Sequence, residues 1–219
     1  MILSAAAREP VTQHSGSQRI DRISNAVAVL FMPQVSSAYA FLALSIASGL
    51  EETLLYLLFS ILFASLIQLG SFLVYVRFSK RDPNVQDRED RPILFATAVL
   101  SYLIGYAALR YLGAPSIFSA LMFAYFANTS LAAVITRYLT KVSIHSWGIT
   151  GPSVAMLYSF GITGFVLMLV AGAIVGSTRI RLGYHTGRQV IVSFVASIPL
   201  TWFIVYIVPA ILPTIFGAY

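Results

Sequence analysis

The chain contains no cysteine and only eight acidic residues among 219. Without cysteine, the chain can be stabilised neither by a disulfide bond nor by a metal ion bound to thiolates. Charged residues make up only 10% of the chain, whereas hydrophobic residues make up 58%. Because a soluble domain carries about 25% charged residues, this composition indicates a protein embedded in a membrane.

The net charge of +6 does not indicate nucleic-acid binding in so apolar a chain. In a membrane protein, basic residues gather in the loops of one side and also bind phosphate groups. Residues 1–20 lack the apolar run of a cleavable signal peptide, and a transit peptide is the alternative interpretation. We interpret residues 1–22 as a flexible polar tail and residues 23–219 as one membrane-embedded domain.

Long apolar stretches predict an all-α fold, a polytopic integral membrane bundle of six or seven membrane helices. Turn residues and charges mark the boundaries between these stretches. The clearest expected helices cover residues 23–48 with a kink at Pro33, 53–76 after a turn at Glu51 and Glu52, 92–111, 116–139, and 189–216.

The stretch 148–176 determines whether a site can assemble. As one helix it would extend about 44 Å, which exceeds a hydrocarbon core of about 30 Å. Gly161 and Gly164 favour a break, and a broken helix returns to the side it left. We therefore predict a short helical hairpin over 148–176, which brings His145 and His185 to the same side of the membrane.

This topology predicts an uneven distribution of charge between the two faces of the bundle. Thirteen of the fourteen lysine and arginine residues lie on the face that holds the polar clusters. The opposite face carries only Glu51, Glu52 and Arg110 as charges. The positive-inside rule therefore predicts that the clustered face is cytoplasmic.

Two histidines follow basic residues at the ends of apolar stretches. Arg179 and Arg181 precede His185, so a phosphate held by their guanidinium groups lies within reach of its imidazole. Neutral imidazole is a nucleophile toward phosphorus. His145 offers a second titratable group, which a displacement needs in order to protonate the departing alkoxide. The alternative interpretation of His145 and of His185 is a solvated loop histidine that has no catalytic role.

Four further residues are candidates for binding the same phosphate. Ser143 offers a hydroxyl group or its backbone N–H, and Lys141 offers a charge or, alternatively, an interfacial anchor. Arg88 and Arg91 are three residues apart and share a face if the helix that opens near Pro92 extends backward. In the alternative interpretation, the acidic residues of the same loop neutralise the charges of these two arginines, and the loop is simply solvated.

Three short motifs resemble those of the type 2 phosphatidic acid phosphatase (PAP2-like) superfamily of membrane lipid phosphatases, which are K-x6-R-P, P-S-G-H and S-R-x5-H-x3-D. The matching residues are Arg91-Pro92 for the first, Ser143 and His145 for the second, and Thr178-Arg179-x5-His185 for the third. The motifs occur in this order over residues 88–189, about half of the chain, so the sequence resembles a divergent member of the superfamily.

This resemblance implies a phosphatase that needs no metal or cofactor. It implies that His185 is the nucleophile and His145 the general acid. Arg179 and Arg91 would bind the phosphate, with assistance from Ser143.

The motifs also depart from the superfamily pattern at several positions. The lysine of the first motif is replaced by Asn84, and the proline and glycine of the second by Val142 and Ile144. The final aspartate of the third motif is Gln189. Its carbonyl oxygen can accept the imidazole N–H and orient the ring, but a neutral residue stabilises imidazolium less than a carboxylate does.

We therefore expect a multi-pass membrane enzyme that hydrolyses a phosphate or diphosphate monoester of an isoprenyl or phosphatidyl lipid. The expected intermediate is phosphohistidine, and Arg88, Lys141 or Arg181 would add positive charge around the phosphate. The expected partners are the lipid substrate and the bilayer. The alternatives are a lipid-linked phosphotransferase on the same scaffold and a non-catalytic protein that binds or transports lipids.

Overall fold

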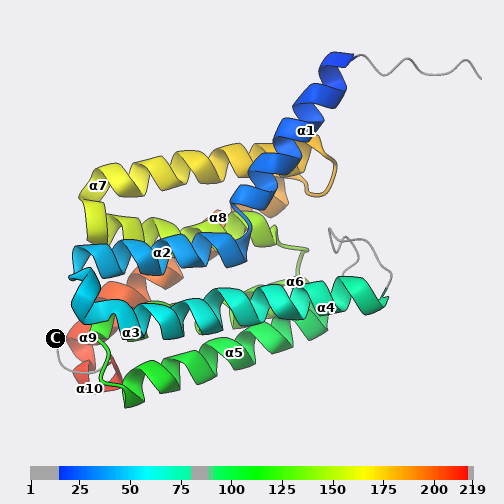
Figure 1. Ribbon diagram of the computed structural model, residues 1–219. Coiled ribbons are helices and arrows are strands. Elements are labelled where there is room, and N and C mark those ends of the chain that lie inside the picture. Colours follow the sequence, from blue (N-terminus) through cyan, green and yellow to red (C-terminus); the bar gives the residue numbers. More distant parts are fainter. Residues whose placement is uncertain (1–14, 80–88, 90, 217–219) are drawn as a thin grey trace, which may run out of the picture.

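The computed structural model describes residues 15–79, 89 and 91–216, and in these residues it contains helices and no strands. The predicted all-α fold class is thereby confirmed. The helices pack side by side in one bundle, and α1 projects beyond it (Figure 1). Their bounds are α1 (Ser15–Leu30), α2 (Pro33–Ala47), α3 (Leu50–Ile61), α4 (Ile67–Ser79), α5 (Arg91–Tyr111), α6 (Ser116–Tyr138), α7 (Ile144–Arg181), α8 (Gly187–Trp202), α9 (Val208–Ile211) and α10 (Pro213–Phe216).

Two wider, π-helical turns join neighbouring helices without a loop. They are η1 (Leu62–Leu66), between α3 and α4, and η3 (Phe203–Ile207), between α8 and α9. Such turns insert one extra residue into a helix and shift the direction of the side chains that follow. The joined segments Leu50–Phe78 and Gly187–Ile211 each act as one long apolar helix.

Five helical stretches of the described chain are long and apolar enough to cross a membrane, which indicates a membrane protein. A sixth would be α1 and α2 together, which meet at a bend of 47°. The break between α1 and α2 lies immediately before Pro33, as predicted. Proline has no backbone N–H, so it cannot continue the hydrogen-bond pattern of the preceding helix. Large apolar side chains on the outside of the bundle, including Leu58, Ile162 and Val195, are more than half exposed, and a bilayer would cover them.

One of the five stretches, α7, is a hairpin. Gly161 has φ 65° and ψ −159°, a conformation that essentially only glycine adopts, and the chain reverses there (Figure 1). Residues 144–160 form the first arm and residues 162–181 the second. Counting the arms separately gives six or seven segments, so the predicted hairpin and the predicted number of helices are confirmed.

Gly172 and Gly176 let the second arm of α7 approach α8, because added Cβ atoms would lie 2.7 Å from Phe194 and from Val190, and the same two glycines lie beside the first arm. A Cβ atom added to Gly172 would lie 3.4 Å from Cγ2 of Ile149, and one added to Gly176 would lie 3.6 Å from Oγ of Ser146. These pairs place the end of the second arm beside the beginning of the first. The hairpin therefore brings the two ends of α7 together.

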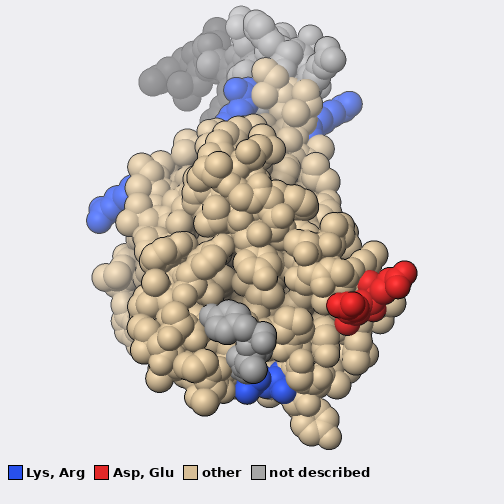
Figure 2. Space-filling model, turned by 90° about the vertical axis from the view of Figure 1, so that its left-hand side faces the viewer, with Lys and Arg blue, Asp and Glu red and all other residues tan. Residues whose placement is uncertain are grey.

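The ends of α7 lie at the same end of the bundle as the start of α5, the end of α6 and the start of α8 (Figure 1). The opposite end, which faces the viewer in Figure 2, displays few charged side chains. Glu51 and Glu52 lie there in the first turn of α3, and Arg110 lies in the last turn of α5. The small number of charges at this end is consistent with the prediction that most lysine and arginine residues lie at the end that holds the two ends of α7.

Two expected boundaries were wrong. Residues 15–22, assigned to a flexible tail, form the beginning of α1, and residues 1–14 lie outside the described part of the chain. Glu51 and Glu52 do not form a turn but occupy the first turn of α3, where negative charge is favourable beside the helix N-terminus. The turn before α3 is made by Gly49, whose φ of 92° suits glycine.

The central core surrounds α6. Phe118 and Met122 of α6 are fully buried, and the ring of Phe118 stacks on that of Phe41 with 6.0 Å between centroids. The absence of a side chain at Gly105 lets Phe63 approach α5, because an added Cβ would lie 2.7 Å from Cβ of Phe63. This packing holds α2, α5 and α6 around the interior in which the candidate site lies.

We predict that Gly161→Ala destabilises the protein by about 1–3 kcal/mol, because alanine is strained in the backbone conformation of the reversal. Thermal unfolding in detergent micelles would measure the effect. Gly70→Ala is the matched control, since nothing lies within 4 Å of a Cβ atom added there. Equal unfolding midpoints for the two variants would contradict the reversal at Gly161.

Candidate functional site

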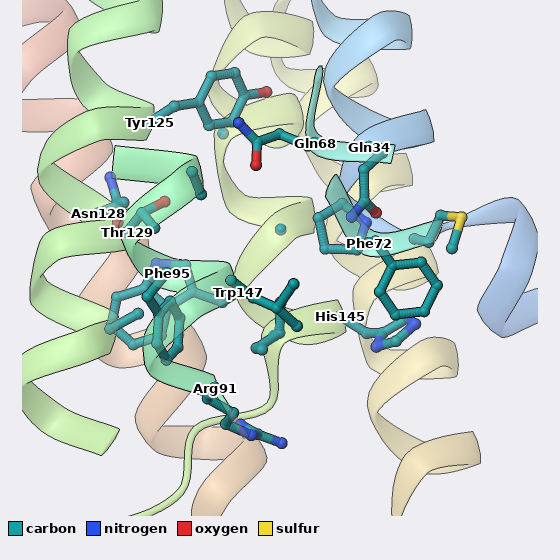
Figure 3. A pocket seen from close by; sticks show the side chains of 18 of the residues that line it. Gln34, Gln68, Phe72, Arg91, Phe95, Tyr125, Asn128, Thr129, His145 and Trp147 are labelled. Atoms are coloured by element: carbon teal, nitrogen blue, oxygen red, sulfur yellow. The ribbon is translucent and has the colours of Figure 1, made fainter. Parts of the chain in front are cut away.

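A cavity of about 550 Å³ lies inside the bundle and is lined mainly by apolar side chains. Two arginines and two histidines line it, namely Arg91, Arg179, His145 and His185. They come from α5, from both arms of α7 and from the turn before α8. Figure 3 shows Arg91 and His145 toward one end of the cavity, which we call the charged end.

Arg91 is the first residue of α5 and is almost fully buried, with 2% of its surface exposed. Its Nη1 donates a hydrogen bond to the carbonyl oxygen of Val142 at 2.8 Å. This bond links the start of α5 to the segment that precedes α7. Pro92 follows in the first helical turn, where no backbone donor is needed.

A backbone turn holds Arg179 and His185 together. The N–H groups of Tyr184 and His185 both donate to the carbonyl oxygen of Arg179, at 3.1 Å and 3.2 Å. Gly183, with φ 74°, provides the left-handed conformation that ends the helix. The guanidinium carbon of Arg179 also lies 4.3 Å from the centroid of the Tyr184 ring, a cation–π contact. The turn therefore holds the arginine and the histidine in a fixed relation.

Gln189 determines which nitrogen of His185 carries the proton. Its Oε1 lies 3.0 Å from Nδ1 of His185 and accepts the backbone N–H of Thr186 at 3.2 Å. Because a backbone N–H can only donate, the atom that receives it is the amide oxygen and not the nitrogen. Nδ1 of His185 must then be the donor, so in the neutral ring Nε2 carries the lone pair.

The charge state of His185 follows from its surroundings. Burial is the largest cause that lowers its pKa, and the positive charges of Arg91, Lys141 and Arg179 act in the same direction. The hydrogen bond with Gln189 acts in the opposite direction, and the resulting pKa is about 3. The ring is therefore neutral at physiological pH, which is the form that can attack an electrophile.

His145 lies in the first turn of α7, two residues after the N-cap Ser143. The Ser143 hydroxyl accepts hydrogen bonds from the backbone N–H and the hydroxyl group of Ser146, at 3.4 Å and 3.0 Å. The N–H of Ser143 donates to Oγ of Ser193 at 2.9 Å. This cap defines the start of the helix and thereby positions the histidine against the cavity.

The structure brings most of the predicted site residues together. Arg91, Arg179, His145 and His185 line one cavity, and Gln189 contacts His185 as expected of an orienting residue. Arg88, which was predicted to share a helix face with Arg91 and to contact the phosphate, lies outside the described residues.

Three other predicted phosphate ligands lie elsewhere. Ser143 is fully buried in the N-cap of α7 and does not line the cavity, because the helix start uses its hydroxyl group. Arg181 is exposed at the end of α7 and does not line the cavity either. Lys141 is partly buried outside the cavity lining, although its charge still acts on His185.

Two residues that support the charged end could not be identified from the sequence. Tyr184 lines the cavity and stacks on Arg179, and its only signal in the sequence was its place between the arginine and the histidine. Ser193 accepts the N–H of Ser143 and donates to the carbonyl oxygen of Gln189 at 2.8 Å. It joins α8 to the start of α7, a contact between distant segments that no local pattern indicates.

The charged end suits an anion. No acidic side chain of the described residues lines the cavity, and no group of three or more His, Cys, Asp or Glu side chains among them could hold a metal ion. Two arginines can offer several N–H donors to the oxygens of one phosphate. A neutral imidazole beside them adds a nucleophile to this binding site.

No family model, curated protein or solved structure matches this chain. The functional interpretation therefore depends on the three short motifs and on the geometry of the charged end.

We predict that inorganic phosphate binds at the charged end and that Arg91→Met or Arg179→Met weakens its binding about 10- to 150-fold, the loss expected for one charged hydrogen bond. Isothermal titration calorimetry of the detergent-solubilised protein would measure the dissociation constants. Arg137→Met is the matched control, because Arg137 is exposed at the end of α6 and does not line the cavity. Equal weakening by all three variants would indicate general charge attraction instead of a site.

Proposed function

We propose that this protein is an integral membrane phosphatase that hydrolyses a phosphate or diphosphate monoester of a lipid. The supporting observation is that Arg91, Arg179, His145 and a neutral His185 line one cavity within an apolar bundle. Arginine binds phosphate oxygens, histidine supplies a nucleophile and an acid, and apolar walls accept a lipid chain. The resemblance to the PAP2-like superfamily supports the same assignment.

In the first step, Nε2 of His185 attacks phosphorus and forms a P–N bond while the bond between phosphorus and the lipid oxygen breaks. The departing oxygen leaves with the electron pair and takes a proton from His145, which acts as general acid. Arg91 and Arg179 stabilise the charge on the remaining phosphoryl oxygens during the displacement.

In the second step, water replaces the histidine on phosphorus. His145, now neutral, removes a proton from the water as its oxygen bonds to phosphorus, and the P–N bond breaks. Inorganic phosphate leaves, and His185 regains its lone pair on Nε2. Throughout both steps Gln189 keeps the proton on Nδ1 of His185, which makes it a positioning residue.

The arrangement in the bilayer follows from the same proposal. The apolar helices cross the membrane several times, and the charged end lies near one membrane surface, where a lipid phosphate group is found. The expected excess of lysine and arginine at this end would make it the cytoplasmic side. The apolar part of the cavity then receives the lipid chain from within the bilayer.

We predict that His185→Ala lowers phosphate release from a lipid phosphate by at least about a thousandfold and that His145→Ala lowers it about 10²- to 10⁴-fold. Phosphate release by the purified protein in mixed micelles would measure both effects, with Arg137→Met as the control. Labelled substrate should also transfer an acid-labile phosphoryl group to the parent protein but not to His185→Ala.

Other outcomes would favour the alternatives. Transfer of the label to an added alcohol with little free phosphate would identify a phosphotransferase. Equal phosphate release from the parent and His185→Ala proteins would overturn the proposed nucleophile. Lipid binding that depends on the arginines, without any turnover, would indicate a non-catalytic lipid-binding protein.

Because the pKa of His185 is lowered, we can also predict how the activity depends on pH. A base with a pKa near 3 stays neutral as the pH falls through 6.5, the usual histidine value, so kcat/KM should not fall there through protonation of His185. Lys141→Met removes a positive charge that lowers this pKa, so the acidic limb should move toward neutral pH. A pH profile of kcat/KM from about pH 2 to about pH 8 covers the acidic limb and would detect the shift.

The control for this experiment is Arg77→Met, because Arg77 is exposed in the last turn of α4. Its profile should match that of the parent protein. A shift in the opposite direction for Lys141→Met would contradict the assigned effect of the lysine on His185.

A further inference from the structure

Gln34, in the first turn of α2, lines the same cavity as the two histidines. Its Oε1 is buried and has no hydrogen-bond partner among the described residues. Figure 3 shows the amide end of Gln34 directed toward Phe72 and His145. The two steps proposed above give this side chain no role.

The start of α2 packs directly against the first arm of α7. A Cβ atom added to Gly148 would lie 2.7 Å from Cβ of Pro33, the residue before Gln34. His145 and Gly148 are three residues apart, so they lie on the same face of the arm. The helix face that carries His145 therefore meets the start of α2, which brings Gln34 to the histidine's side of the cavity.

The buried oxygen of Gln34 calls for a hydrogen-bond donor. Nearly all buried polar groups in native proteins are paired, because an unpaired one destabilises the fold. An amide oxygen accepts and cannot donate, so its partner must carry an O–H or N–H group. A water molecule held between Gln34 and His145 meets this need, because it has two protons and can donate one to each side chain.

The second step of the proposed reaction places a water molecule on this side of the phosphate. Attacking and leaving oxygens lie roughly in line at phosphorus, so the water enters opposite Nε2 of His185, where the lipid oxygen left. His145 serves that position in both steps. No acidic side chain of the described residues lines the cavity, so a second acceptor for this water has to be a neutral oxygen such as that of Gln34.

From this arrangement we infer that Gln34 is a positioning residue that selects water as the acceptor of the phosphoryl group. As the water oxygen bonds to phosphorus, the P–N bond breaks and its electron pair returns to Nε2 of His185. His145 takes one proton. The other stays on the product phosphate and is donated in a hydrogen bond to Oε1 of Gln34. The inference rests on the proposed function and assigns its preference for hydrolysis to one residue.

An alcohol cannot use Gln34 in the same way as water. Its single O–H proton goes to His145, and its alkyl group then faces the amide oxygen, which stays unpaired. Gln34 therefore favours water over an alcohol by about one hydrogen bond, which corresponds to a factor of about 2 to 12.

The test measures how the phosphorylated protein divides its phosphoryl group between water and methanol. Diacylglycerol phosphate or farnesyl phosphate, whichever the parent protein hydrolyses faster, is supplied with a labelled phosphate in mixed micelles that contain methanol. Gln34→Met keeps the length of the side chain but removes the amide. It should raise the initial ratio of methyl phosphate to inorganic phosphate about 2- to 12-fold. Both products come from the same phosphorylated protein, so this ratio does not depend on how much of a variant has folded.

Gln68→Met is the matched control for the loss of an amide. Gln68 also lines the cavity, but Figure 3 shows it toward Tyr125 and away from Arg91. Its unpaired atom is Nε2, which donates and cannot accept a proton from water. Gln68→Met should leave the product ratio at the parent value. Gln34→Glu, which keeps an acceptor oxygen at position 34, should not raise the ratio.

The outcomes separate the inference from the proposed function. An unchanged ratio in Gln34→Met, or an equal rise in Gln34→Met and Gln68→Met, would overturn the inference, while phosphate release by the parent protein would still support the phosphatase. Absence of both phosphate release and phosphohistidine in the parent protein would overturn both. In a chase with unlabelled substrate, labelled phosphohistidine should persist about 2- to 12-fold longer in Gln34→Met than in the parent, because the second step is slowed. An equal lifetime in the two proteins would contradict the inference.

Discussion

The reversal of α7 at Gly161 is the constraint on which the candidate site depends. If residues 144–181 formed one straight helix, His145 and Arg179 would lie about 51 Å apart. The positive φ of Gly161 instead returns the second arm along the first, so that Gly172 and Gly176 lie beside Ile149 and Ser146. The turn that follows the second arm then places His185 against the residues at the beginning of the first arm.

The charged end also depends on the directions of the helices. α5 begins at Arg91, α7 begins immediately before His145, and α8 begins two residues after His185. Helix N-termini carry partial positive charge and unpaired N–H groups, so they favour an anion as the arginines do. Because no acidic residue of the described chain lines the cavity, a bound phosphate would relieve the mutual repulsion of these positive charges.

The extent to which the sequence predicts this protein differs between the fold and the site. Apolar length and turn residues identify α5, α6 and the hairpin, because hydrocarbon thickness and glycine conformation act locally. The orienting contact of Gln189 with His185 was also predictable, because Gln189 stands at the position of the final aspartate in the third motif. The role of Ser143 was not, since its hydroxyl group could bind either a ligand or the helix start, and only the arrangement of the chain in space decides. The partners of Tyr184 and Ser193 likewise depend on segments distant in sequence.

The hairpin has a consequence for how such a chain can vary during evolution. Each residue of an α-helix turns the side chains that follow by about 100°, so one residue inserted into either arm would rotate His145 or Arg179 away from the cavity. Most substitutions on the outer faces of the arms, by contrast, only exchange one apolar surface for another. Homologous chains should therefore tolerate wide changes in sequence on the outer faces of the two arms but few changes in length, and a length change in one arm should accompany a matching change in the other.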